Sequence, residues 1–330
     1  MEQRQLGKSD RQVSVVALGT FAFSGWYWGP ADDSASEATV RAALDAGMTS
    51  IDTAPVYGCG RAEEVLGRAL KGRRHEAQLL TKCGLRWDDD EGTFDFDMRF
   101  PDGSEKRITR NLRPTSVRFE CEQSLKLLDT DYLHLFQCHW PDPETPIADT
   151  MGEMVRLHTE GKIRAVGVSN FSVEQMEEAR QALGNIPLAS DQPKYNLLQR
   201  KIEADVLPYC REHQVGVLAY SPLELGLLSG KFKEAPTTKG DLRKTRGWFK
   251  DEKRGAINEA VRTHLGRIAE EQNATPAQVA VAWVIRTPGV TSALMGARTP
   301  EQAVENAGAA RVVLSSKQML DLAEAFASVA

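Results

Sequence analysis

Short apolar runs alternate with longer amphipathic segments along most of this 330-residue chain. An apolar run of about four to eight residues is typical of a buried strand, and a longer amphipathic run is typical of a helix. Eight such strand–helix units follow one another without a low-complexity linker, which predicts an α/β fold, a parallel (β/α)8 TIM barrel. We expect its strands at residues 13–18, 49–53, 78–82, 132–138, 163–168, 188–192, 216–220 and 291–294.

Amphipathic segments fill the intervals between these strands. A doubly wound sheet is the structural alternative, and it would place a G-x-G-x-x-G turn after the first strand. The chain has Gly19-Thr20-Phe21-Ala22 there instead, so we predict one barrel domain over residues 1–330. The expected helices are 34–46, 62–70, 114–128, 147–159, 173–183, 201–213, 276–286 and 300–308, with an extra C-terminal helix at 318–327.

Two connections are too long to be simple turns. Residues 86–113 follow the third strand and are acidic before they become basic, and residues 223–254 follow the seventh. The active sites of such barrels lie on the loops that follow the strands. We therefore expect both loops to form walls of a pocket, with plain surface insertions as the alternative.

The charge balance and the cysteines narrow the class of protein. The net charge is −5, which argues against a dedicated partner for nucleic acid or anionic membranes. We expect no membrane span, because no stretch approaches about 18 apolar residues. The five cysteines form no C-x-x-C pair, and an odd number suits free thiols in a reducing compartment. We therefore expect a cytoplasmic protein.

Polar residues recur where the predicted strands end, and in a closed barrel all these ends meet at one mouth. Any one of them could be a turn-former or a packing residue. Together they would place several costly polar groups in one place, which favours a shared function. The residues are Asp52, Tyr57, Lys82, His139, Ser169, Asn170, Gln192, Tyr220 and Ser221.

Four of these residues have complementary chemistry. A phenol such as Tyr57 is a poor acid at neutral pH, and a nearby Lys82 ammonium would lower its pKa. A buried lysine needs an anion, which Asp52 can supply. An imidazole at His139 can orient a substrate oxygen or relay a proton. The set predicts a device that protonates a carbonyl oxygen, whereas the histidine and cysteine spacings predict no metal site.

Six ordered motifs resemble the aldo-keto reductase superfamily over nearly the whole chain. The resemblance is strongest to the bacterial branch that is similar to potassium-channel β subunits and general-stress reductases. The motifs are IDTAPVYG at 51–58, TKCG at 81–84, HWPD at 139–142, GKIRAVGVSNF at 161–171, YSPL at 220–223 and GARTPEQ at 296–302.

The resemblance implies an NADPH-dependent carbonyl reductase with NADPH/NADP+ as cofactor and a small-molecule carbonyl substrate. Tyr57 matches the general acid of the family, Asp52 and Lys82 match the pair that tunes it, and His139 matches the residue that positions the carbonyl. We expect Trp26, Trp28, Trp87 and Trp140 to line the substrate pocket, since aromatic walls suit apolar or sugar-like carbonyls.

The resemblance also implies the cofactor contacts. Ser169, Asn170 and Gln192 match groups that bind the nicotinamide carboxamide, and Tyr220 matches the aromatic ring stacked on its face. Arg298 lies at the start of a helix and suits the 2′-phosphate that distinguishes NADPH from NADH. Thr20 matches a contact near the ribose and nicotinamide, Asp52 is a further cofactor contact, and Gly296 lies with Arg298 after the eighth strand. The other matching residues are Ser221, Pro222, Leu223, Gly226, Lys231 and Arg243 around the pyrophosphate, and Gln302, Glu305 and Asn306 around the adenosine.

Two rival functions use the same barrel. A nucleotide-sensing protein would bind NADPH, turn over slowly and act through a protein partner. A Schiff-base enzyme would use Lys82 as a nucleophile. Cys59 and Cys83 each lie beside a proposed catalytic residue, and we interpret them as small core residues, with a redox switch as the alternative.

Overall fold

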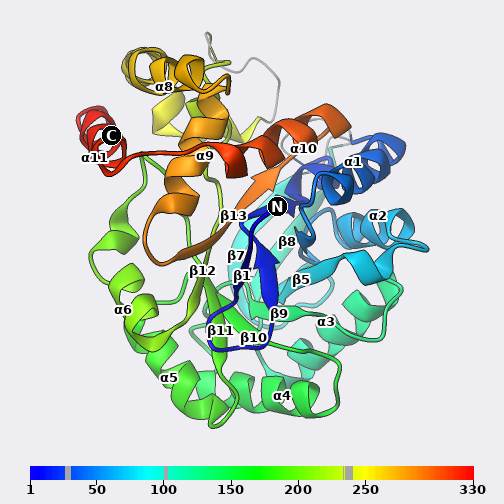
Figure 1. Cartoon of the computed structure of the whole chain (residues 1–330). Coiled ribbons are helices and arrows are strands. Elements are labelled where there is room, and N and C mark those ends of the chain that lie inside the picture. Colours follow the sequence, from blue (N-terminus) through cyan, green and yellow to red (C-terminus); the bar gives the residue numbers. More distant parts are fainter. Residues whose placement is uncertain (27–30, 100–102, 233, 235–240) are drawn as a thin grey trace.

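Eight parallel strands close into a barrel in this computed structural model, which describes residues 1–26, 31–99, 103–232, 234 and 241–330 (Figure 1). All eight expected strands are present, so the prediction of a (β/α)8 barrel is confirmed. Around the barrel the strands are β3 (Val16–Gly19), β4 (Ser50–Asp52), β5 (Gln78–Cys83), β9 (Leu135–Cys138), β10 (Val166–Ser169), β11 (Leu188–Gln192), β12 (Gly216–Ala219) and β13 (Val290–Gly296).

Helices surround this barrel where the amphipathic segments predict them. Sequence signals set their ends: Ser172 and Gln175 form a capping box at one helix start, and Pro114 opens another. The covering helices are α1 (Asp33–Asp45), α2 (Arg61–Ala69), α3 (Pro114–Leu127), α4 (Ile147–Thr159), α5 (Val173–Leu183), α6 (Val206–His213), α9 (Pro276–Arg286), α10 (Pro300–Ala307) and the expected C-terminal α11 (Ser316–Ala327).

Successive side chains of each strand point alternately into the barrel and outward toward the helices. Leu80, Leu135 and Leu218 belong to one small buried cluster, distinct from the large core between strands and helices. Side chains two positions further along a strand point to the same side. Lys82 and Tyr220 therefore lie directly above the apolar layer of Leu80 and Leu218, at the end of the barrel where the strands finish.

The first expected strand is divided into two. Residues 12–14 form β2 (Gln12–Ser14), which pairs antiparallel with β1 (Gln3–Gln5), and only β3 belongs to the barrel. Leu6 and Val13 join the interior cluster of the barrel. The N-terminal hairpin thereby closes the end of the barrel at which the strands begin (Figure 1).

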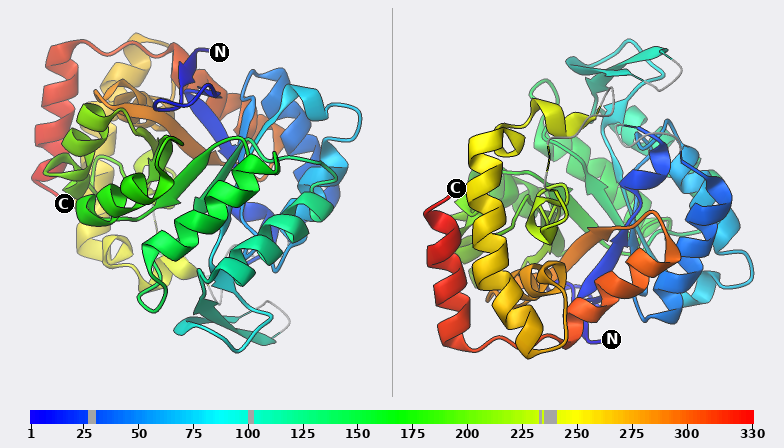
Figure 2. Two further views of the ribbon diagram at one scale, coloured as in Figure 1. Left: turned by 90° about the horizontal axis from the view of Figure 1, so that it is seen from below. Right: turned by 90° about the horizontal axis from the view of Figure 1, so that it is seen from above.

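The connection after the third barrel strand is a small sheet and not the irregular loop that we expected. Its strands are β6 (Leu85–Arg86), β7 (Thr93–Arg99) and β8 (Glu105–Arg110), with β8 in the middle. Residues 93–99 alternate between aromatic or apolar and charged side chains, the period of a strand. Figure 2 shows this sheet projecting from the end of the barrel opposite the N-terminus.

The connection after the seventh strand is partly helical. Our expected loop of residues 223–254 extends into α7 (Asp251–Ala260), because the first turn of that helix carries Asp251 and Glu252, which favour a helix start. The other elements there are η4 (Leu227–Ser229), η5 (Leu242–Thr245), η6 (Gly247–Phe249), the π-helical turn η7 (Val261–Leu265) and α8 (Gly266–Glu271).

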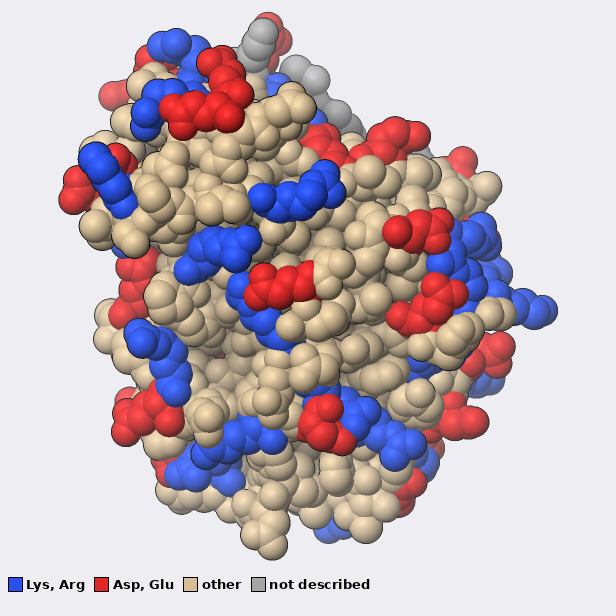
Figure 3. All heavy atoms as spheres, viewed as in Figure 1, with Lys and Arg blue, Asp and Glu red and all other residues tan. Residues whose placement is uncertain are grey.

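Two further observations concern the surface charge and the apolar character of the helices. Acidic and basic side chains are interspersed over the described residues of the face seen in Figure 3. Across the described residues, no helix combines the length and the apolar character that crossing a membrane requires.

Candidate active site

A buried carboxylate joins three barrel strands at the mouth. Oδ1 of Asp52 accepts a hydrogen bond from Nζ of Lys82 at 2.6 Å, and Oδ2 accepts one from Nε2 of Gln192 at 2.8 Å. The side chain of Lys82 is fully buried, and its ammonium also donates to the carbonyl oxygen of Thr53 at 2.8 Å. A buried charge is tolerated only when it is paired and hydrogen-bonded in this way.

Tyr57 completes a chain of polar groups that begins at Asp52. Its hydroxyl lies 3.5 Å from Nζ of Lys82, and the ammonium sits 5.1 Å from the centre of its ring. Burial would lower the pKa of Lys82, but Asp52 and Tyr57 raise it above its ordinary value, so the lysine stays charged. An ammonium is therefore held against the phenol.

The pKa of Tyr57 differs in direction from our expectation. Burial raises it above the ordinary value, and the Lys82 ammonium only opposes that rise. We expected the lysine to dominate, but residue types alone do not reveal how much of the phenol is removed from water. The phenol is therefore protonated at neutral pH and holds a proton that it could donate.

His139 lies beside this phenol. The rings of Tyr57 and His139 meet edge to face with 5.9 Å between centroids, and the backbone N–H of His139 donates to the carbonyl oxygen of Cys83 at 2.9 Å. Burial lowers the pKa of His139 well below its ordinary value, and the Lys82 ammonium adds to the effect. The imidazole is thus neutral, and it can donate a hydrogen bond without carrying a charge.

Ser169, Asn170 and Tyr220 form a second hydrogen-bonded group at the same mouth. Nδ2 of Asn170 donates to Oγ of Ser169 at 2.9 Å and to the carbonyl oxygen of His139 at 3.2 Å. The hydroxyl of Tyr220 donates to Oδ1 of Asn170 at 3.0 Å, and Oγ of Ser169 donates to the carbonyl oxygen of Gln192 at 2.7 Å. The predicted nicotinamide contacts are therefore together.

The loop after β12 adopts an unusual backbone. Ser221, Glu224 and Leu225 have φ values of 52°, 44° and 56°, and Gly226 has 91°. Such left-handed residues need support from their surroundings. Nδ2 of Asn196 supplies it by donating to the carbonyl oxygen of Ser221 and to Oε2 of Glu224, both at 2.9 Å.

The sequence reasoning missed these supporting residues. Asn196 follows the sixth barrel strand closely, so the signal that selected Gln192, a polar residue after a strand, could also have found it. Glu224 is fully buried and additionally accepts from Nζ of Lys194 at 2.8 Å. Gln137 was missed as well, and its Oε1 lies 3.4 Å from Nε2 of Gln192.

The predicted phosphate and adenosine residues come together only in part. Nζ of Lys231 lies 3.3 Å from Oε2 of Glu305, which joins the loop after β12 to α10. Oε1 of Gln302 accepts from the backbone N–H of Arg298, and Nδ2 of Asn306 donates to the carbonyl oxygen of Gly296. Arg298 thus lies where α10 begins. Arg243 instead pairs with Asp241 and covers the ring of Phe232, while Pro222 is buried and Leu223 partly buried.

Aromatic side chains surround Tyr57 on the side of the projecting sheet. Trp26, Trp87 and Trp140 belong to one cluster with Tyr57 and Phe96. Three of the four predicted substrate residues are therefore together, and Trp28 lies outside the described residues. This cluster forms an aromatic wall beside the predicted general acid.

Cys59 and Cys83 lie close to Tyr57 and Lys82 in the chain. Burial raises the pKa of Cys59 to about 11 and that of Cys83 well above its ordinary value, so both thiols stay protonated, which favours a packing role.

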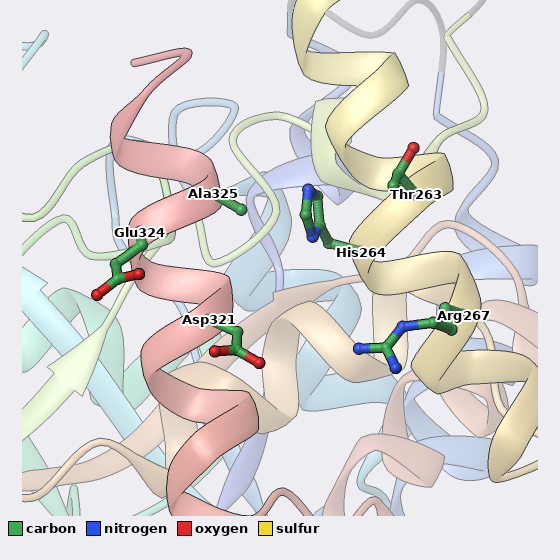
Figure 4. Close-up of a pocket in the computed structure, with 6 residues that line it drawn as sticks. All are labelled: Thr263, His264, Arg267, Asp321, Glu324 and Ala325. Atoms are coloured by element: carbon green, nitrogen blue, oxygen red, sulfur yellow. The ribbon is translucent and has the colours of Figure 1, made fainter.

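Among the described residues, no group of His, Cys, Asp and Glu side chains is arranged to hold a metal ion. A shallow groove of about 590 Å³ separates α11 from η7 and α8, and it contains none of the predicted site residues (Figure 4).

The fold and this mouth define the class of protein. A closed (β/α)8 barrel with a Tyr–Lys–Asp chain and a neutral histidine at the ends of its strands is the arrangement of a barrel oxidoreductase. The model of the Aldo/keto reductase family matches residues 15–326, and the chain belongs to that family.

Three known proteins illustrate the similarity. The "Aldo-keto reductase YhdN" of Bacillus subtilis is 40% identical over 92% of this chain and 86% of its own length. The "NADH-specific methylglyoxal reductase" of Escherichia coli is 34% identical over 98% and 99%. The structure of the glycerol dehydrogenase AKR11B4 from Gluconobacter oxydans has 38% identity and a TM-score of 0.86, covering 99% of this chain and 95% of its own.

The residues at the mouth fit the nicotinamide cofactor that the family uses. The buried hydroxyl of Thr20 has no hydrogen-bond partner among the described residues, and it follows β3 directly. Apart from Gly296 and its two chain neighbours, no heavy atom of the described residues lies within 4 Å of the position that a Cβ on Gly296 would occupy, so there is open space at the end of β13. A polar ligand could use both features.

Proposed function

We propose that this chain is an NADPH-dependent reductase of aldehydes and ketones in which Tyr57 is the general acid. The observation that carries the proposal is the buried chain from Asp52 through Lys82 to the Tyr57 hydroxyl. It holds a protonated phenol against a fixed ammonium at the mouth of the barrel. A bound nicotinamide would supply the hydride to the carbonyl carbon.

The side chains of the protein then protonate and orient the carbonyl oxygen of the substrate. Tyr57 gives its proton to the carbonyl oxygen as negative charge develops there, and the Lys82 ammonium stabilises the phenolate that remains. The neutral His139 imidazole donates a hydrogen bond to the same oxygen and orients it. Ser169, Asn170 and Gln192 hold the carboxamide of the cofactor, and Tyr220 offers a ring for stacking.

The preference for NADPH is the finer part of the proposal. Arg298 at the start of α10 supports it, because an arginine fork and a helix N-terminus both suit a 2′-phosphate. Lys231 lies on the same side through its contact with Glu305. The relative from Escherichia coli is named as NADH-specific, which is opposite to the preference proposed for this chain.

The substrate is proposed as a small carbonyl compound. The names of two similar proteins refer to methylglyoxal and glycerol, both small oxygenated molecules. The aromatic wall of Trp26, Trp87 and Trp140 supports a confined pocket. We further propose a single-domain cytoplasmic enzyme, since the family match spans nearly the whole chain and all five cysteines are free.

The rival mechanism with Lys82 as a Schiff-base nucleophile has less support. Such a lysine must be neutral to attack, whereas the pKa of Lys82 is raised and its nitrogen donates hydrogen bonds to Asp52 and to the Thr53 carbonyl. The sensor alternative makes a different prediction, namely binding without turnover.

A consumption assay tests the proposal. Purified protein is mixed with NADPH, and separately with NADH, over a panel of small aldehydes, ketones and aldoses. We expect rapid consumption of NADPH and slower consumption of NADH. Tight binding of NADPH without consumption on any carbonyl would reject the reductase in favour of the sensor.

A further inference from the structure

The projecting sheet brings its own side chains to the wall beside Tyr57. Met98 and Ile108, both fully buried, pack in the same cluster as Trp26. Phe96 stacks on Trp26 with 5.6 Å between ring centroids and 14° between ring planes. The sheet is thereby fixed against the loops that carry the proposed substrate residues.

One charged pair of this sheet contacts the loop that follows His139. Arg110 on β8 donates from Nε and Nη2 to Oδ1 of Asp95 on β7, at 3.0 and 2.7 Å. Its guanidinium lies 5.3 Å from the centre of the Trp140 ring, and Nη1 donates to the carbonyl oxygen of Pro141 at 3.3 Å. Trp140 directly follows His139 in the chain. Arg110 therefore contacts the residue next to the group proposed to orient the carbonyl.

The pair retains capacity for hydrogen bonds. Among the described residues, the partners of Arg110 account for three of its five N–H groups, and Oδ2 of Asp95 has no partner. The side chains are 27% and 17% exposed, so they are shielded but reachable. A neutral pair that offers donors and an acceptor at one place suits a hydroxyl group, which both donates and accepts.

We propose that the Asp95–Arg110 pair selects carbonyl substrates that carry hydroxyl groups on the first and second carbons from the carbonyl. This inference rests on the proposed reductase function and names the substrate class of its site. The hydroxyl groups bind the pair while the carbonyl oxygen lies at Tyr57 and His139. Because the pair has no net charge, it gives no preference for a carboxylate or a phosphate on the substrate.

Two aldehydes of equal length test the inference. Glyceraldehyde and propanal differ only in two hydroxyl groups, and the readout is the ratio of their kcat/KM values with NADPH. We expect Arg110→Met to lower the ratio of glyceraldehyde to propanal about tenfold or more, since a site built to bind a hydroxyl discriminates strongly. Asp95→Asn lowers it in the same direction.

Arg107 provides a matched control on the same strand. Its guanidinium also stacks on an aromatic ring, 4.9 Å from the centre of Phe94, but on the exposed opposite face of β8. Arg107→Met should leave the ratio as it is in the wild type. An equal fall in the ratio for Arg107→Met would overturn the inference, because the effect would then be a general disturbance of the sheet.

The remaining outcomes are also decisive. A ratio that stays constant in Arg110→Met, or a fall of both kcat/KM values by the same factor, overturns the inference while the reductase proposal stands. No turnover of glyceraldehyde by a wild type that reduces other carbonyls overturns the inference, whereas no turnover of any carbonyl in the panel rejects the proposed function itself. Should Arg110→Met fail to fold, Arg110→Lys and Asp95→Asn decide, and an unchanged ratio in both overturns the inference.

Discussion

Gln192 and Asp52, 140 residues apart in the chain, meet inside the barrel with 2.8 Å between Nε2 and Oδ2. The other oxygen of Asp52 binds Lys82, so one buried carboxylate joins β4, β5 and β11. Each of the three side chains has few alternative positions. This arrangement sets the place of the Lys82 ammonium and, through it, the environment of the Tyr57 phenol.

Lys82→Met tests how much stability depends on this pair. The variant leaves the Asp52 carboxylate buried without its cation, and we expect the free energy of unfolding to fall by about 3–5 kcal/mol. Asp52→Asn combined with Lys82→Met should recover much of that stability, because no lone charge remains, but not the activity. Urea unfolding and aldehyde turnover provide the two measurements.

An exposed lysine gives the control for this experiment. Lys317 forms an ion pair with Asp321 at 2.7 Å, but its side chain is 82% exposed. Lys317→Met should change the free energy of unfolding by less than about 1 kcal/mol. If Lys82→Met lowers the free energy of unfolding by no more than Lys317→Met does, the account of the buried pair is contradicted.

Glu120→Gln tests the pH dependence of stability. Glu120 is buried behind β5 and accepts from the backbone N–H of Gly84 at 2.8 Å, and burial raises its pKa to about 8. In the unfolded chain its pKa is about 4.3. Between these two values the unfolded state loses a proton that the folded state keeps, so the contribution of Glu120 to stability is lost as the pH rises.

The variant should therefore gain stability over the wild type as the pH rises from about 4.5 to 8, by about 2–4 kcal/mol. Glu122 is the matched control, since it lies exposed on the same helix and Lys162 lowers its pKa. The free energy of unfolding of Glu122→Gln should change with pH over this range in the same way as that of the wild type. If the free energies of unfolding of Glu120→Gln and the wild type differ by the same amount over this whole pH range, Glu120 is ionised in the folded protein.

Arg298→Gln tests the proposal that Arg298 binds the 2′-phosphate of NADPH. Loss of a charge-assisted contact should raise the KM for NADPH roughly 10- to 100-fold and leave the KM for NADH nearly unchanged. Arg311→Gln, at an exposed arginine in the turn that follows α10, is the control. Equal changes in the two KM values would remove Arg298 from the phosphate site.

The polar residues of the mouth could be predicted because the barrel places every strand end at one side. Asp52 and Gln192 each end a strand, Lys82 is the last residue but one of β5, and the structure joins them by direct hydrogen bonds. The helices could be predicted where capping residues mark them, as Ser172 and Pro114 do. Local signals and the barrel topology agree at these positions, which is why the sequence was sufficient.

Other features depend on contacts between segments that local patterns do not reveal. The strand period of residues 93–99 competes with aspartates, which strands disfavour, so the sheet went unrecognised. The left-handed turn at Ser221 is supported by Asn196, whose contact exists only after the fold has formed. The pKa of Tyr57 likewise depends on how deeply the phenol is buried, which the sequence does not state.

Single-turnover reduction by Tyr57→Phe tests the central claim most directly. Protein preloaded with NADPH is mixed with an aldehyde, and the loss of NADPH is followed in the wild type, in Tyr57→Phe and in Tyr209→Phe. The hydroxyl of Tyr209 binds Glu177 on the helical exterior, so its loss is the control. We predict a rate about 10²- to 10⁴-fold lower in Tyr57→Phe with unchanged NADPH affinity, and a near-normal rate in that variant would contradict the account.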